Sequence, residues 1–414
     1  MSKLAIHGGS KVIDKKYQKS FHPQISEDFY MQIENNNFRS QITAFDAPII
    51  TTFQNKAKEY FGLKHILPTN SGTSALFEMY YAVGLQKNDE VIVPVYTFFA
   101  TATPLFVLGC VPILVDCLDN GNIDPDDIKR NITPKTKAIV ITHMWGIPCN
   151  MDEIMEISRE SKIPVLEDVS HAHGAMYKGK MTGTFGKCAA WSLGAKKLIT
   201  GGQGGMLGTD DEEVYQKAVL LGHANNKRIK DITLENLIPY SVSGVGLNLR
   251  MHPFSAALLI DQLNHYSSQV KERNEVANYL MKEISSIPGL KIPYIPADSI
   301  PAWYGLPVIY DANAFKGLSR EKFVDALIAE GATGYDIPHT TGPITEYEIF
   351  NEHGVFFNRD KRIKKYYSSK QFKNAEFFHG SIFLLPVWYG EDRMNYAKAH
   401  IAALKKVVKH YKEV

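Results

Sequence analysis

Three stretches of this 414-residue sequence carry residue types that could hold and activate a small molecule. The first, Thr69 to Leu76, reads Thr-Asn-Ser-Gly-Thr-Ser-Ala-Leu and places a polar turn between a strand-like run and a helix-like run. The start of a helix presents unpaired backbone N–H groups, and hydroxyls at the same turn add donors, so this stretch could bind a phosphate. A plain Ser/Thr helix cap is the alternative interpretation.

The second stretch, Val165 to Gly174, places two carboxylates and two imidazoles after an apolar strand. Ligands of open α/β sheets bind beyond the carboxyl ends of the strands, so Asp168 could keep a ring nitrogen of a ligand protonated. Glu167, Asp168, His171 and His173 could instead hold a metal ion, but the apolar neighbours supply no convincing fourth ligand. We therefore expect no metal site.

The third stretch, Trp191 to Gly205, contains Lys196 and Lys197 in otherwise apolar and Gly-rich surroundings. A desolvated lysine has a lowered pKa and can form a Schiff base with a carbonyl group. Taken alone, the pair could equally be two surface lysines. A phosphate cradle, a strand-end aspartate and such a lysine are together what is needed to hold pyridoxal phosphate and to use it as an electron sink.

These stretches must be positioned by an α/β sheet, because short apolar runs between residues 60 and 210 alternate with helix-like stretches or turns. We expect about seven strands, mostly parallel, between two helical layers in a three-layer αβα fold. The link after residue 193 is short, so the last strand should be antiparallel. We expect a large domain over residues 1–270, with an N-terminal arm, and a smaller α+β domain over 271–414. The runs are 65–68, 90–94, 111–115, 137–143, 163–167, 188–193 and 205–209.

Composition excludes several classes of protein. The formal net charge is +2 and no long basic run is present, so no nucleic-acid partner is expected. We find no signal-peptide core and no segment apolar enough for a membrane. Cys110, Cys117, Cys149 and Cys188 are scattered without a Cys-x-x-Cys pair, which favours buried thiols in a reducing cytoplasm.

The motifs occur in a recognisable order. Ser-Gly-Thr-Ser-Ala-Leu, Glu-Asp-x-x-His-x-x-Gly, Ser-x4-Lys, Gly-x-Gly-Gly and Gly-x-Asn-x-Arg-Met closely resemble the DegT/DnrJ/EryC1/StrS family of sugar aminotransferases, within the aspartate aminotransferase fold type. The resemblance extends from about Leu4 to the C-terminal helix and is looser in the last third. It implies pyridoxal phosphate as cofactor.

The resemblance also assigns roles residue by residue. The family's Schiff-base lysine lies five residues after the phosphate-binding serine, here Ser192, and therefore falls on Lys197, with Lys196 as a mere neighbour. Asp168 matches the acid that pairs with the pyridine nitrogen. The other positions that it implies as cofactor-binding are Gly72, Thr73 and Ser74 at the phosphate, Phe98 stacked on the ring, His171 beside the ring oxygen, and Asn248.

In the family, the residue matched by Asn248 reaches the cofactor phosphate of the neighbouring subunit, so the resemblance implies a homodimer with shared active sites. The implied reaction is a ping-pong transfer of an amino group from glutamate or glutamine to the ketone of a sugar or cyclitol, in amino-sugar, antibiotic or polysaccharide biosynthesis. A departure is Gln203, which stands where the family usually has Glu or Asp, and residues 335–343 follow the substrate segment only loosely. The opening Lys3 to Gly9 looks more like the subgroup that acts on cyclitol ketones, amino-shikimate precursors or free keto sugars.

Three alternatives remain. A pyridoxamine-dependent sugar dehydratase has histidine at the lysine position, so Lys197 argues against it. A non-catalytic ligand-binding protein of the same fold is disfavoured because the lysine, the acid and the phosphate-binding residues are all present. A nucleotide-binding Rossmann enzyme lacks its Gly-x-Gly-x-x-Gly after a strand.

Overall fold

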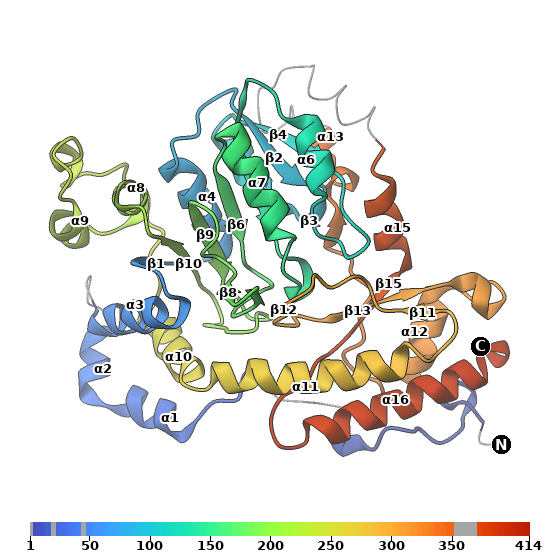
Figure 1. Cartoon of the computed structure of the whole chain (residues 1–414). Helices are drawn as coiled ribbons and strands as arrows, with labels where there is room; N and C mark the ends of the chain where they lie inside the picture. Colours follow the sequence, from blue (N-terminus) through green and yellow to red (C-terminus); the bar gives the residue numbers. More distant parts are fainter. Residues whose placement is uncertain (1–2, 18–21, 43–46, 352–370) are drawn as a thin grey trace.

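The computed structural model describes residues 3–17, 22–42, 47–351 and 371–414. A seven-stranded sheet forms its centre, in the order β1-β10-β9-β6-β5-β2-β4 (Figure 1). Only β10 runs antiparallel to its neighbours within this sheet, which confirms the prediction for the last strand. The strands are β1 (His65–Thr69), β2 (Glu90–Pro94), β4 (Val111–Val115), β5 (Thr136–Thr142), β6 (Val165–Asp168), β9 (Cys188–Ser192) and β10 (Gly205–Thr209).

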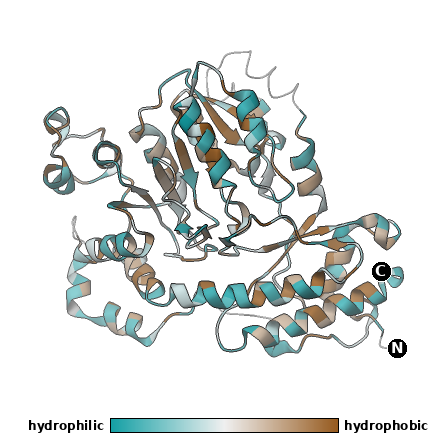
Figure 2. Ribbon diagram, viewed as in Figure 1, coloured by the Kyte–Doolittle hydropathy of each residue, from teal (hydrophilic) through white to brown (hydrophobic). Residues whose placement is uncertain are grey.

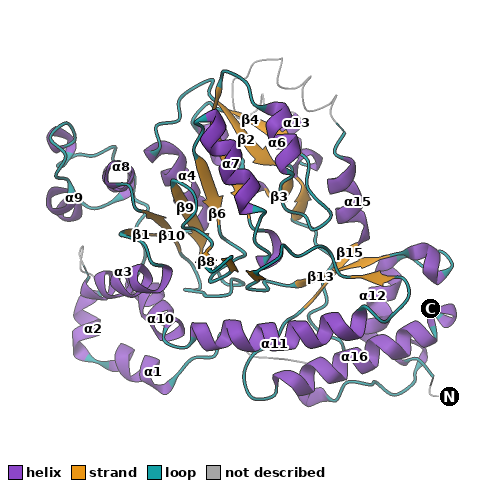
Figure 3. Cartoon of the chain, in the orientation of Figure 1, coloured by secondary structure: helices purple, strands orange, loops and turns teal. Residues whose placement is uncertain are grey.

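The strands are buried on both faces because their apolar side chains alternate between two helical layers. In β5, Val140 packs in the core beneath helices α4 (Gly72–Ala82) and α8 (Glu212–Gly222), whereas Ile139 and Ile141 pack on the opposite face. The predicted αβα fold is thereby confirmed (Figures 1 and 3). The opposite layer contains α3 (Pro48–Phe61), α6 (Pro125–Asn131), α7 (Met151–Ser161) and α10 (Pro253–Leu263).

Capping residues fix where the helices begin. Ser71 accepts a hydrogen bond from the N–H of Ser74 at the start of α4, and Asp211 accepts one from the N–H of Val214 at the start of α8. Asp124 caps α6, whose first residue is Pro125, and this pairing is typical of a helix start. The loops before these helices therefore end at defined points along the sheet.

A second apolar core lies against α11 (Tyr266–Ile284), α12 (Arg320–Ala329) and α16 (Arg393–Lys409). It contains an antiparallel sheet of β11 (Leu290–Lys291), β13 (Leu306–Tyr310) and β15 (Ile382–Leu385). Figure 2 shows α11 and α16 banded with both hydrophilic and hydrophobic residues. Leu4 and Ile13 pack into this core from the other end of the chain.

The division between residues 270 and 271 remains our proposal for the two domains, and α11 runs across that point. The second apolar core would form the centre of the smaller domain, and the N-terminal segment packs against it. None of the described helices combines the length and the apolarity that a bilayer-spanning segment needs.

Two short sheets outside the seven-stranded sheet were not predicted from the sequence. A β3–β14 pair joins Tyr96–Phe98 to Thr341–Pro343, and a β12–β7–β8 sheet joins Ser299–Ile300, Met176–Tyr177 and Lys180–Met181. The remaining α-helices of the described residues are α1 (Glu27–Glu34), α2 (Asn36–Gln41), α5 (Thr103–Val107), α9 (Asn225–Asp231), α13 (Glu348–Asn351) and α15 (Lys373–Ser381).

Candidate active site

Lys197 lies in the loop between β9 and β10, where it is partly buried. Its Nζ is 4.8 Å from the centroid of the Tyr304 ring. Desolvation lowers the pKa of Lys197 from 10.5 to about 8, while the charge of Asp168 acts in the opposite direction. The side chain therefore lies within range of the aspartate charge, and about a tenth of its amine is neutral at pH 7 and about half at pH 8.

The backbone around Lys197 is held from two sides. Its N–H donates to the carbonyl of Gly194 over 3.0 Å, and its carbonyl contacts Nε2 of His22 at 2.9 Å. Lys196, by contrast, is exposed. The two neighbouring lysines thus lie in different surroundings, as a reactive and a non-reactive lysine should.

Asp168 ends strand β6 and is almost fully buried. Thr101 Oγ1 donates to its Oδ2 over 2.8 Å, and the N–H of Ser170 donates to its Oδ1 over 3.0 Å. Thr101 belongs to a small buried network, because its hydroxyl is 2.9 Å from that of Thr97, which in turn lies 3.1 Å from that of Thr142. The carboxylate is therefore fixed in direction at the carboxyl edge of the sheet.

The side chain of Glu167 points to the opposite face of β6 from that of Asp168. Its carboxylate accepts hydrogen bonds of 2.6–2.7 Å from the N–H groups of Gly183, Phe185 and Gly186, and lies 3.1 Å from Nε2 of His143. These bonds occupy the acceptor atoms of the carboxylate and hold the loop at residues 183–186 in place. No cluster of three or more metal-ligating side chains occurs in the described part of the chain.

His171 lies in a stack of rings. Its imidazole is parallel to Tyr304, with centroids 4.1 Å apart, and lies 5.4 Å from Trp145. Its Nδ1 is buried and has no hydrogen-bond partner among the described residues. Burial, and secondarily the charge of Lys197, hold the pKa of His171 well below its usual value, so the ring is neutral.

His173 has a structural contact instead. Its Nδ1 accepts a hydrogen bond from the N–H of Ile199 over 3.3 Å, close to the Lys197 loop. Burial lowers its pKa to about 3, so it too is neutral at physiological pH. The two histidines therefore add no positive charge beside the lysine.

The start of α4 lies against the end of β9. A Cβ added to Gly72 would come within 2.5 Å of Cβ of Ser192, so only glycine allows this approach. Ser71 and Ser74 bring their hydroxyls to 2.9 Å from each other at the same turn, and Thr73 is the second residue of the helix. The structure thus brings together four of the predicted phosphate-binding residues, namely Gly72, Thr73, Ser74 and Ser192.

Phe98 and Asn248 are both exposed to solvent. Phe98 ends β3 with 37% of its surface exposed, so it is an accessible aromatic rather than a core residue. Asn248 accepts a hydrogen bond from Nε of Arg250 over 2.9 Å, and the next residue, Leu249, accepts one from the N–H of Asn70. Asn248 therefore lies near the α4 turn of its own chain.

Three residues of the site were not predicted from the sequence. Thr101 orients Asp168, and Trp145 and Tyr304 form the ring stack with His171. Trp145 follows the carboxyl end of β5, a position that the strand-end rule could have indicated. Tyr304 comes from more than a hundred residues beyond Lys197, and no local pattern marks it. Its loop is fixed because its N–H donates to the carbonyl of Trp145 over 3.0 Å.

Comparison with known proteins finds similar aminotransferases and a matching family. The sequence profile of the DegT/DnrJ/EryC1/StrS aminotransferase family matches residues 24–395. The chain is 33% identical to GDP-perosamine synthase of Caulobacter vibrioides, over 63% of this chain and 67% of that one. It is 28% identical to L-glutamine:scyllo-inosose aminotransferase of Streptomyces griseus, over 83% and 82% of the two chains. A solved aminotransferase from Psychrobacter cryohalolentis shares the fold, with a TM-score of 0.83, 24% identity, and coverage of 94% of this chain and 99% of that one.

Proposed function

Because the chain belongs to the DegT/DnrJ/EryC1/StrS aminotransferase family, we propose that it transfers an amino group from glutamine or glutamate to the ketone of a sugar or cyclitol, with pyridoxal phosphate as its cofactor. The observation that carries the proposal is the partly buried Lys197. Its pKa of about 8 arises from desolvation, and it lies within reach of the charge of Asp168. A solvated lysine stays almost wholly protonated near neutral pH, which makes it a poor nucleophile and base.

The described side chains fit a cofactor that has a phosphate, a basic ring nitrogen and an aldehyde. The tight approach of Gly72 to Ser192, with the hydroxyls of Thr73 and Ser74 at the helix start, would hold the phosphate. Asp168 would pair with the ring nitrogen, Phe98 would cover the ring, and Lys197 would bind the aldehyde carbon. When bound, pyridoxal phosphate supplies a pyridinium ring that draws electrons from the substrate carbon bearing the amino group.

Each residue then has a defined task. Nζ of Lys197 removes a proton from the substrate carbon and later returns one, since its neutral form is accessible near pH 8. Asp168 holds a proton on the ring nitrogen, with its direction fixed by Thr101 and the N–H of Ser170. Neutral His171 can offer its unpartnered Nδ1 to a ring substituent without adding charge.

The choice of acceptor rests on similarity. One relative is named for a GDP-linked sugar product and another for scyllo-inosose with L-glutamine. The N-terminal Lys3 to Gly9 favours cyclitol ketones or free keto sugars, so we place these first. Gln203 lies exposed in the loop after Lys197, where its neutral amide replaces the usual acid. The dehydratase alternative is disfavoured because Lys197 occupies the position at which it needs histidine.

A homodimer would complete the site. Exposed apolar side chains recur from Ile229 in α9 to Phe254 in α10, and Asn248 lies within this segment. Contiguous exposed apolar residues are typical of an interface between subunits. The exposed side chains are Ile229, Ile238, Tyr240, Val242, Val245, Leu247 and Phe254.

The test of this function is an amination assay with a defined donor. The protein and pyridoxal phosphate are incubated with glutamine or glutamate, each labelled with ¹⁵N at its α-amino group, and with scyllo-inosose, a free 3-keto hexose or a GDP-linked 4-keto sugar. Mass spectrometry should find one of these ketones converted to an amine that carries the label. Conversion of none of them, or loss of a hydroxyl without gain of nitrogen, would contradict the proposal.

A further inference from the structure

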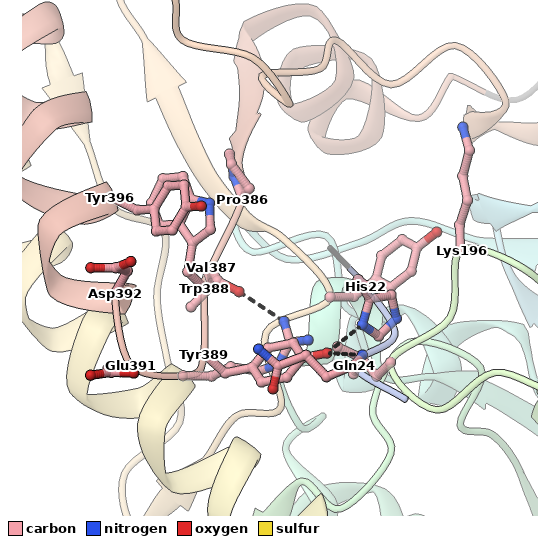
Figure 4. Close-up of a pocket in the computed structure, with 13 residues that line it drawn as sticks. His22, Gln24, Lys196, Pro386, Val387, Trp388, Tyr389, Glu391, Asp392 and Tyr396 are labelled. Atoms are coloured by element: carbon pink, nitrogen blue, oxygen red, sulfur yellow. Dashed lines mark hydrogen bonds between the residues drawn. The ribbon is translucent and has the colours of Figure 1, made fainter. Parts of the chain in front are cut away.

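A cavity of about 340 Å³ opens beside the Lys197 loop (Figure 4). Its wall is formed by the segment before α1, the β9–β10 loop, α11, the segment before β13, the segment between β15 and α16, and the start of α16. Its size is within the range of small-molecule sites, which is about 300–1,000 Å³. Its lining includes His22, Lys196, Arg273, Tyr304, Val387 and Tyr389.

The cavity adjoins the candidate catalytic lysine. Lys196 and Leu198, which flank Lys197 in sequence, line it, and so does Tyr304, whose ring lies under Nζ of Lys197. His22 bridges the two sides, since one ring nitrogen lies 2.9 Å from the carbonyl of Lys197 and the other 3.0 Å from the hydroxyl of Tyr389. A molecule reacting at Lys197 could therefore extend into this space.

A buried cation forms part of the wall. Arg273 projects from α11 and is only 6% exposed. Nη1 donates to the carbonyl of Val387 over 2.8 Å, and the guanidinium carbon lies 4.6 Å from the centroid of the Tyr389 ring. Nε is buried and has no hydrogen-bond partner, and no described carboxylate forms an ion pair with this side chain.

This arrangement is costly without an anion. Arginine stays protonated in proteins even where burial lowers its pKa, as it does for Arg273. A buried charge is ordinarily paired, and a guanidinium binds a carboxylate through two parallel hydrogen bonds. A small carboxylate in the cavity would supply the missing partner.

The remaining charges restrict which anion fits. Glu391, Asp392 and Lys196 also line the cavity, and all three are exposed. With Arg273 the wall carries two charges of each sign, so it has no excess positive charge to hold a polyanion such as a sugar nucleotide, whereas a single carboxylate can pair with the buried guanidinium. Glutamine carries one carboxylate, and its remaining groups are neutral or cationic.

We propose that Arg273 binds the α-carboxylate of the amino donor in this cavity. The inference rests on the proposed aminotransferase function, and it adds the group that orients the donor toward Lys197. It also assigns the cavity to the donor rather than to the phosphate groups of an acceptor.

Titration calorimetry on the protein loaded with pyridoxal phosphate tests this without turnover. The probe is glutaramate, which keeps the carboxylate and carboxamide of glutamine but lacks its amine, and the control ligand is glutaramide, which has no carboxylate. We expect glutaramate to bind the wild type with a measurable Kd that is about 10- to 100-fold weaker in Arg273→Met, as expected for a charged hydrogen-bonded pair. Arg273→Lys should lose less, and Arg159→Met, on the exposed face of α7, should match the wild type.

Three results would overturn the proposal: no binding of glutaramate to the wild type, equal binding of glutaramate and glutaramide, or an unchanged Kd in both Arg273 variants. Melting temperatures measured in parallel identify a variant that has lost its fold, and Arg273→Lys then carries the comparison. If glutaramate binding depends on Arg273 while no ketone is aminated, the carboxylate site stands and the proposed function fails.

Discussion

At the residue scale, burial distinguishes the two neighbouring lysines. Lys196 is exposed, whereas Lys197 is partly enclosed and contacts the face of Tyr304. Because removing an ammonium group from water disfavours its charged form, the pKa of Lys197 falls to about 8. The reactivity that we propose for Lys197 thus follows from its surroundings, since both residues are the same amine.

This pKa predicts how the cofactor loads with pH. Only the neutral amine attacks the aldehyde, so the second-order rate of loading should rise about tenfold per pH unit below 8 and level off above it. Stopped-flow absorption after mixing cofactor-free protein with pyridoxal phosphate measures this rate. Nα-acetyl-lysine, with an ordinary pKa near 10.5, serves as the reference and should keep accelerating. A protein profile that follows this reference through pH 10 would contradict the prediction.

Most of the proposed site residues could be predicted from the sequence, but the residues that contact and orient them could not. Lys197, Asp168 and the Gly72 turn stand in local motifs that follow strands, so their types and spacing mark them. Thr101 and Tyr304 are recognised only through what they contact, Asp168 in one case and His171 in the other. Such contacts join distant segments, and no short pattern encodes them.

At the element scale, the approach of α4 to β9 shapes the proposed phosphate site. Gly72 faces Ser192, and Gly205 of the neighbouring strand passes under the same turn, where an added Cβ would lie 2.2 Å from the carbonyl oxygen of Ser71. Two glycines therefore let the helix start against the sheet. The open N–H groups of that start and the Ser192 hydroxyl then face a common space.

Gly72→Ala should accordingly weaken cofactor binding through the phosphate. The new methyl group would be 2.5 Å from Cβ of Ser192, and relieving that clash costs about 1–3 kcal/mol and moves the helix start. We expect the Kd for pyridoxal phosphate, measured by absorption titration, to rise at least about tenfold, and that for pyridoxal to change much less.

Gly380→Ala is the matched control, because nothing lies within 4 Å of a Cβ at this position in α15. It should leave both affinities unchanged. Equal affinities of Gly72→Ala and the wild type for pyridoxal phosphate would remove the α4 turn from the proposed site.

The strands of the large sheet were predictable because they are nearly continuous apolar strings bounded by turn residues. The antiparallel direction of β10 followed from the short link after β9. The short pairs were not predictable, since β3 and β14 are joined across more than two hundred residues and each contains only three.

At the scale of the whole molecule, the projecting α9 region bears an apolar surface that the chain itself leaves open (Figure 1). Asn248 lies within the segment that bears this surface and is beside Asn70, whose side-chain amide is 3.5 Å from the carbonyl of Asn248. We propose that a second copy packs on this surface and that the Asn248 segment of each chain then reaches the site of the other.

Subunit complementation tests this arrangement. Asn248→Ala and Lys197→Ala chains are each expected to be weak or inactive alone. In a shared-site dimer, a mixed pair has one site with both lesions and one intact site, so random mixing should restore about a quarter of the wild-type activity. Activity after unfolding, mixing and refolding is compared with that of each variant treated alone. No recovery, although affinity capture through a different tag on each chain shows mixed dimers, would exclude shared sites.

The central claim is that Lys197 holds pyridoxal phosphate for transfer of an amino group. The most direct measurement is the visible absorption spectrum of the protein loaded with cofactor, before and after adding glutamine or glutamate. We predict a visible band that one of these donors bleaches, and that is absent in Lys197→Ala but present in Lys137→Ala, whose lysine is exposed on β5. A band that neither donor changes, or a Lys197→Ala protein that behaves like the wild type, would contradict the account.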